Sequence, residues 1–206
     1  MNIKLILCDF DGTITREDTL DALCHAMGKG ALSQAINQRF IDGEQDGQSA
    51  LIERFSLLEG MTSTQLESVL EQVVLTEGAE ELFAYAHEKG IQTLVLSGNA
   101  SIVLDYYAKK LHFSKICSSH ILVENGYIQS WDPQRCSCVD KGAGAAAYIK
   151  ELGLAPQQII AIGDSRADQS LFDLAGTSFL VNKKGNITAD HEIQRLNEVL
   201  PYLQKG

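Results

Sequence analysis

Basic residues are scarce in this chain of 206 residues: 17 Lys and Arg stand against 27 Asp and Glu, a formal net charge of −10. A nucleic acid or an anionic membrane surface would therefore meet general electrostatic repulsion. Long apolar runs are also missing, since no uninterrupted stretch approaches the roughly 18 residues of a membrane span. The first apolar run, residues 5–8, ends at Asp9 and is too short for the core of a signal peptide. We therefore expect a cytoplasmic protein that binds neither nucleic acid nor membrane.

Cysteine is not arranged as a disulfide framework. The chain has five cysteines, an odd number, and no secretory signal, which is typical of reduced thiols. Cys136 and Cys138 form a C-x-C pair, but no second pair of Cys or His stands at zinc-finger spacing. We therefore interpret this pair as structural.

Proline is limited to three residues, and none of them lies between residues 15 and 77. This stretch instead shows four segments of helical period that are separated by glycines. We interpret residues 15–77 as a small helical-bundle cap inserted into a larger domain. The predicted cap helices span residues 19–27, 32–41, 49–58 and 66–74.

The rest of the chain alternates between strand-like and helix-like segments. Four short apolar runs with little alternation are typical of strands buried on both faces of a parallel sheet. Two further runs around Asn125 and Gly126 predict a β-hairpin. We expect an α/β fold with a doubly wound, Rossmann-like parallel-sheet core, formed by residues 1–14 and 78–206. The predicted core strands span residues 3–8, 91–96, 159–162 and 179–181, and the predicted core helices span residues 79–88, 100–111, 142–152 and 167–174.

Carboxylates follow two of the predicted strands. Asp9 and Asp11 stand two residues apart after the first strand, and Asp164 and Asp168 stand four apart after the third, on one face if a helix begins there. Because ligands of open α/β sheets bind beyond the carboxyl ends of strands, we expect one shared crevice. Lys141 offsets only one of the four negative charges, so a divalent cation or a protonated carboxyl is needed. The oxygen ligands favour Mg²⁺, which shares its shell with phosphate oxygens.

Four segments in this order resemble the four motifs of the haloacid dehalogenase-like phosphotransferases. They are C-D-F-D-G-T-I-T at residues 8–15, L-S-G-N at 96–99, Lys141, and G-D-S-R-A-D at 163–168. The resemblance covers nearly the whole chain and implies a phosphatase of that superfamily. The helical insertion, with R-F-S-L-L at residues 54–58 and T-E-G-A-E-E at 76–81, is similar to that of phosphoserine phosphatases.

The resemblance implies a role for each matching core residue. Asp9 would be the nucleophile that forms an aspartyl-phosphate, and Asp11 the acid that protonates the leaving oxygen and then the base that activates water. Mg²⁺ would be bound by the Asp9 carboxylate, the backbone carbonyl of Asp11 and Asp164. Asp168 would orient a metal-bound water or Lys141. The groups implied to bind the phosphoryl oxygens belong to Gly12, Ser97, Gly98 and Lys141.

Two cap residues bear on the substrate. Arg54 matches the arginine that binds the substrate carboxylate in phosphoserine phosphatases, and Asp18 stands where a glutamate commonly meets the substrate amine. The fourth motif also departs from that group, because Ser165 and Ala167 replace a Gly and an Asn. The resemblance therefore favours a small phosphomonoester as the binding partner, with phosphoserine or a similar phosphorylated amino acid first.

Other functions stay open at this point. If the protein is a phosphatase, its substrate could instead be the enol-phosphate of methionine salvage, histidinol phosphate or a phosphocholine-like ester. Outside the phosphatases, a phospho-acceptor signalling module also uses a strand-end Asp, Mg²⁺ and a Lys, but the insertion at residues 15–77 argues against it. The sequence does not give the oligomeric state.

Overall fold

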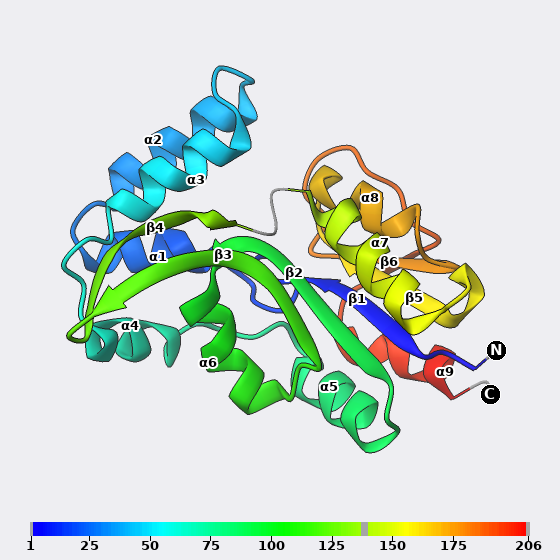
Figure 1. Cartoon of the computed structure of the whole chain (residues 1–206). Coiled ribbons are helices and arrows are strands. Elements are labelled where there is room, and N and C mark those ends of the chain that lie inside the picture. The colour runs from blue at the N-terminus through cyan, green and yellow to red at the C-terminus, as the bar shows by residue number, and fades with distance from the viewer. Residues whose placement is uncertain (1, 137–139, 205–206) are drawn as a thin grey trace.

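The computed structural model describes residues 2–136 and 140–204, and these contain a seven-stranded sheet in the order β4-β3-β2-β1-β5-β6-β7 (Figure 1). All neighbouring strands pair in parallel except β3 and β4, which form the predicted hairpin. The predicted α/β fold with a doubly wound core is thereby confirmed. The strands span Leu5–Asp9 (β1), Gln92–Ala100 (β2), Lys115–Glu124 (β3), Tyr127–Cys136 (β4), Ile159–Gly163 (β5), Thr177–Val181 (β6) and His191–Ile193 (β7).

Helices cover both faces of the sheet because side chains of a strand point alternately to its two sides. In the central strand β1, Ile6 and Cys8 belong to the apolar core beneath α5, α6 and the cap. Leu5 and Leu7 belong to the core beneath α7 and α8 on the other face. Burial on both faces explains why β1 is a continuous apolar run. The core helices span Ala79–Glu88 (α5), Ser101–Leu111 (α6), Lys141–Leu152 (α7), Gln169–Phe172 (α8) and Leu200–Leu203 (α9).

The inserted segment between β1 and α5 forms four helices, as predicted. The predicted end of the fourth helix at residue 74 is wrong, because α4 ends at Leu70. The β-branched Val73 and Val74 favour an extended return to the core, where the carbonyl of Val74 accepts from the Arg16 amide at 3.0 Å. The cap helices span Thr19–Ala26 (α1), Gly30–Ile41 (α2), Gly47–Ser56 (α3) and Ser63–Leu70 (α4).

The hairpin of β3 and β4 reaches past the sheet and holds the cap. The Gly60 amide donates to the carbonyl of Ile128 at 2.9 Å, and the Ile128 amide donates to the carbonyl of Met61 at 2.8 Å. Asn125 and Gly126 at the hairpin turn both have positive φ angles, as such a tight turn requires. In Figure 1 the hairpin runs from the sheet to the region of α1 and α4. The connection between α3 and α4 is therefore fixed to the core.

The structure contains one strand that was not predicted, it differs from one predicted helix, and it leaves one interpretation untested. Strand β7 was not predicted, because its short segment His191–Ile193 has one apolar residue. The helix predicted at 167–174 is a 3-10 turn at Arg166–Asp168 followed by the short α8. Cys138 lies outside the described residues, so the interpretation of the Cys136 and Cys138 pair stays a prediction. Among the described helices, none has both the length and the apolar character that crossing a membrane requires.

Candidate active site

The carboxyl ends of β1, β2 and β5 meet at a pocket of about 580 Å³, which residues of α2 and α3 in the cap also line. Gly98 permits close approach of the cap, since a Cβ there would lie 2.8 Å from Cδ1 of Leu51 on α3. Gly12 and Asp168 are not among the residues that line the pocket but adjoin two that are, Asp164 and Lys141 respectively. Eight of the residues proposed from the sequence line this pocket: Asp9, Asp11, Asp18, Arg54, Ser97, Gly98, Lys141 and Asp164.

Asp9, the last residue of β1, is buried and held by two donors. Nζ of Lys141 lies 2.6 Å from its Oδ1, and the hydroxyl of Thr13 donates to its Oδ2 at 2.8 Å. Lys141 opens α7 and lies 2.7 Å from Oδ1 of Asp168 as well. Burial raises the pKa of Asp9, while Lys141 opposes this rise. Asp9 therefore depends on nearby cations to stay ionised.

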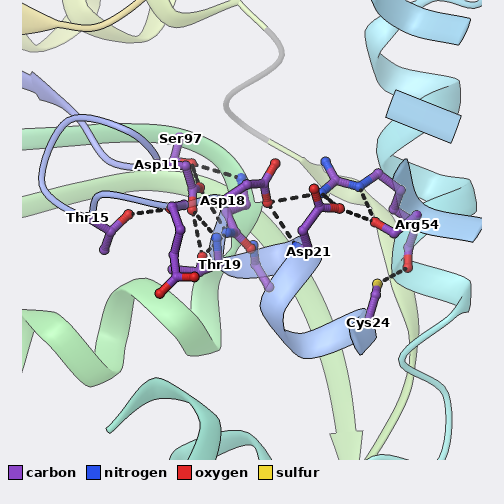
Figure 2. A network of polar contacts seen from close by, with 12 residues as sticks. Asp11, Thr15, Asp18, Thr19, Asp21, Cys24, Arg54 and Ser97 are labelled. Atoms are coloured by element: carbon purple, nitrogen blue, oxygen red, sulfur yellow. Dashed lines mark hydrogen bonds and ion pairs between the residues drawn. The ribbon is translucent and has the colours of Figure 1, made fainter. Parts of the chain in front are cut away.

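Asp11 is oriented by four hydrogen bonds, part of the network in Figure 2. Its Oδ1 accepts from the amide of Thr19 at 2.8 Å and from the hydroxyl of Thr19 at 2.6 Å. Its Oδ2 accepts from Nδ2 of Asn99 at 2.9 Å and from Oγ of Ser97 at 3.3 Å. Burial raises the pKa of Asp11, and the hydrogen bonds from Thr19 and Asn99 oppose this rise.

A cluster of carboxylates beside the pocket has the donor chemistry of a metal site. Carboxylate oxygens of Asp9, Asp164 and Asp168, all buried, lie within 4.8 Å of one another. Both oxygens of Asp168 are engaged by protein groups, because Oδ2 accepts from the amides of Asp164 and Ser165 at 3.0 and 3.1 Å and Oδ1 contacts Lys141. Asp9 and Asp164 line the pocket instead. An all-oxygen, anionic set of this kind fits a hard divalent cation.

The local structure around Asp168 corrects one sequence expectation. Asp164 and Asp168 would share one face if a helix began at Asp164. The chain instead makes a 3-10 turn over Arg166–Asp168, and the Asp168 side chain folds back onto the amides that precede this turn. The carboxylates of Asp164 and Asp168 are therefore close because of these hydrogen bonds to the backbone and not because of helical periodicity.

Lys184 also reaches the cluster, and sequence reasoning missed it. Its Nζ lies 2.6 Å from Oδ2 of Asp164, and its amide donates to the carbonyl of Asp164 at 2.7 Å. Gly12 lies beside this pair with φ of +88°, and a Cβ there would collide with both side chains. Lys184 follows the end of β6, so the rule that ligands gather beyond strand ends could have indicated it.

In the cap, Arg54 is buried between α3 and α1 and its charge is paired twice. Its Nη2 lies 2.9 Å from Oδ1 of Asp18 and 2.9 Å from Oδ1 of Asp21, and its Nε donates to Oγ of Ser33 at 2.9 Å. Figure 2 shows Arg54 reaching from α3 toward both aspartates of the α1 region. Asp18 and Arg54 line the pocket, as expected from the sequence.

Several partners of the predicted residues were not identified beforehand. Thr13, Thr19 and Asn99 bind the two catalytic candidates, while Asp21 and Ser33 bind Arg54. Asn99 had a signal, since it follows Ser97 by two residues at the same strand end. Asp21 also had one, because it lies in the first turn of the predicted helix 19–27, three residues after Asp18.

Comparisons with known proteins show which proteins this chain is similar to. The family model described as haloacid dehalogenase-like hydrolase matches residues 6–173. A phosphoserine phosphatase of Archaeoglobus fulgidus is 29% identical over 95% of this chain, which spans 58% of that relative's length. One of Lactococcus lactis is 27% identical over 98% of this chain and 95% of its own. The solved structure of a phospho-aspartyl intermediate analogue of phosphoserine phosphatase superposes with a TM-score of 0.84 at 26% identity, covering 99% and 100% of the two chains.

Proposed function

The chain belongs to the haloacid dehalogenase-like hydrolases, as a phosphatase of small phosphate esters, and we propose that it works through a phosphoryl group carried covalently by Asp9. One observation carries this proposal. Buried Asp9, in contact with Lys141 and Thr13, lines the same pocket as Asp11, which is oriented by Thr19 and Asn99. The proposed nucleophile and the proposed proton donor thus line the same pocket, where an ester would bind.

In the first step, a carboxylate oxygen of Asp9 attacks phosphorus while the bond from phosphorus to the ester oxygen breaks. Asp11 gives its proton to the departing oxygen, so the alcohol leaves neutral. The hydrogen bonds from Thr19 and Asn99 keep Asp11 aimed at the pocket during this transfer. Burial supports a protonated Asp11 by raising its pKa.

In the second step, water attacks the phosphorus of the aspartyl-phosphate, and Asp11 now accepts a proton from that water. The bond between Asp9 and phosphorus breaks, which releases inorganic phosphate and regenerates the carboxylate. The phosphoryl oxygens are held by Lys141, the Ser97 hydroxyl and the amides of Gly12 and Gly98. These groups stabilise charge on an in-line phosphoryl transition state, where positioning and electrostatics dominate catalysis.

The proposal includes Mg²⁺ as the cofactor. The carboxylates of Asp9 and Asp164 and the backbone carbonyl of Asp11 would hold it, and Asp168 would position Lys141 and the metal shell. When bound, Mg²⁺ supplies the positive charge that offsets the carboxylates and the phosphate.

For the substrate, we propose phosphoserine or a similar phosphorylated amino acid. The adjacent charges of Asp18 and Arg54 complement the ammonium and carboxylate groups of an amino acid. The similarity of the chain to the phosphoserine phosphatases of Archaeoglobus fulgidus and Lactococcus lactis supports the same substrate. Residues 15–77 would act as the cap that selects the substrate, over a phosphatase core of residues 1–14 and 78–206.

Acid quenching during turnover of ³²P-labelled phosphoserine tests the mechanism. The wild-type protein should retain label that hydroxylamine removes, whereas Asp9→Asn should retain none and keep its circular dichroism spectrum. Label retained by Asp9→Asn would refute the nucleophile. A panel with phosphoserine, phosphothreonine, histidinol phosphate and phosphocholine tests the substrate separately, and a preference for either of the last two would replace the amino acid proposal but leave the mechanism intact.

A further inference from the structure

We propose that Lys184 is an internal countercation of the metal site, which neutralises Asp164 in the metal-free protein and moves away from it when Mg²⁺ binds. This inference rests on the proposed function because it takes Asp164 as a metal ligand. Its starting point is the 2.6 Å ion pair between Nζ of Lys184 and Oδ2 of Asp164. Lys184 lies outside the span matched by the family model, residues 6–173.

The burial of the two partners is very unequal. The Asp164 side chain is 4% exposed, whereas that of Lys184 is 55% exposed. A buried carboxylate needs a positive partner, because an unpaired one loses its hydration without compensation. Lys184, in contrast, can return its ammonium group to water at little cost. The structure therefore pairs a fixed anion with a cation that is able to leave.

The backbone around Lys184 is anchored, so exchange requires only side-chain rotation. The Lys184 amide donates to the carbonyl of Asp164 at 2.7 Å. Two residues earlier, Nδ2 of Asn182 donates to the carbonyl of Gly12 at 3.0 Å and to Oγ1 of Thr76 at 3.1 Å. The four-carbon stem of lysine then supplies the reach and the freedom for its ammonium to swing toward solvent.

The space for the ammonium group depends on a glycine. A Cβ at Gly12 would collide with both Nζ of Lys184 and Oδ2 of Asp164. The backbone of residue 12 therefore forms one wall of a narrow space in front of the Asp164 oxygen. A metal ion bound to that oxygen would compete with the ammonium group for the same space, and repulsion between a unit charge and a double charge at contact favours exchange over coexistence.

The chain offers a matched control in the neighbouring Lys183. Its Nζ lies 2.6 Å from Oε1 of exposed Glu192, away from the carboxylate cluster. Lys183→Met and Lys184→Met remove the same charge from adjacent positions of one loop. A difference between the two variants therefore reports the contact with Asp164 and not the net charge of the protein.

Isothermal titration with Mg²⁺, in the absence of substrate, measures the competition directly. Lys184→Met should bind Mg²⁺ about three- to fivefold more tightly, the upper part of the range expected for removing one half-exposed ion pair. Lys183→Met should stay within twofold of the wild type, and Lys184→Arg, which keeps the charge, should not gain affinity. Equal or weaker Mg²⁺ binding by Lys184→Met would overturn the proposal.

Amine labelling of the unaltered protein gives a second readout that no folding defect can affect. With an acylating reagent and mass spectrometry, Mg²⁺ should increase the labelling rate of Lys184 and leave that of Lys183 unchanged. An unchanged or slower rate at Lys184 would mean that its ammonium group stays in place, against the proposal. Asp164→Asn separates the two levels of inference: if that variant loses Mg²⁺ binding but Lys184→Met equals the wild type, the metal site stands and only the role of Lys184 fails.

Discussion

Arg54 offers the sharpest test of how the cap selects a substrate. The Arg54→Ala change removes the guanidinium of a residue that is 5% exposed and leaves Asp18 and Asp21 without their shared cation. Truncating one partner of a buried charge pair costs about 2–5 kcal/mol, or roughly 30- to 4000-fold in kcat/KM at 1.4 kcal/mol per tenfold. Because both aspartates remain and repel a carboxylate, we expect the upper part of that range for phosphoserine, about 300- to 4000-fold.

The assay compares two esters and two variants. p-Nitrophenyl phosphate has no carboxylate, so its kcat/KM should change less than about threefold in Arg54→Ala. Arg39→Ala is the matched control, because Arg39 also lies in the cap but pairs with Glu53 at an exposed position. This control should change kcat/KM for phosphoserine less than about twofold, as expected for a surface ion pair. Thermal unfolding of both variants verifies that the cap stays folded.

An equal loss on both esters in Arg54→Ala would refute the reasoning. Arg54 would then be a residue that holds the cap together through Asp18, Asp21 and Ser33, without contacting the substrate. The proposal of a phosphorylated amino acid would fall with it, whereas the assignment of Asp9 and Asp11 would be unaffected.

Other predictions follow from the core of the site. Asp11→Asn should slow hydrolysis of phosphoserine far more than that of p-nitrophenyl phosphate, whose leaving group needs no proton; equal slowing would contradict the acid role. Since an acid acts while protonated, kcat for phosphoserine should fall as pH rises through the raised pKa of Asp11. Stopped-time assays across pH should find a smaller fall in kcat at high pH for p-nitrophenyl phosphate. A chelator should abolish activity and Ca²⁺ should inhibit, because Ca²⁺ prefers more ligands at longer distances; full activity in excess chelator would exclude the metal. Gly12→Ala should lower the free energy of unfolding by about 1–3 kcal/mol, because residue 12 has a φ of +88° and a Cβ there collides with Asp164. Urea titration measures this free energy, and an unchanged value would contradict the predicted strain.

The fold could be predicted well where burial alone determines the pattern. Strand β1 is buried on both faces, so its residues had to be apolar until Asp9. Helix α5 follows Gly78, whose φ of 82° begins the helix after a turn, and its apolar face gave the same boundaries, Ala79–Glu88, in sequence and structure. Strand β7 offered no such pattern, because a strand of three residues at a sheet edge buries little.

From the sequence, only those residues of the candidate site that lie within a recognisable motif could be predicted. Asp9, Asp11, Lys141 and Asp164 stand at strand or helix ends that the sequence reveals. The contact of Arg54 with Asp21 joins two helices of the cap, and the contact of Asn99 with Asp11 joins the ends of two neighbouring strands of the core. Both contacts join segments that are apart in the chain, so their formation depends on tertiary packing. Local patterns do not contain that information.

The central position of β1 has a consequence for the biogenesis of the protein. Among the described strands, β1 comes first in the chain, yet its two hydrogen-bonded neighbours begin only at Gln92 and Ile159. At about 5–20 residues per second, a ribosome needs roughly 8 to 30 s to make the intervening chain up to Ile159. During this time the cap helices, which rely on local contacts, are able to form while β1 waits with exposed apolar faces. Asp9, the proposed nucleophile, is thus synthesised well before the strands that bury it, and the apolar faces of β1 stay exposed until β5 emerges.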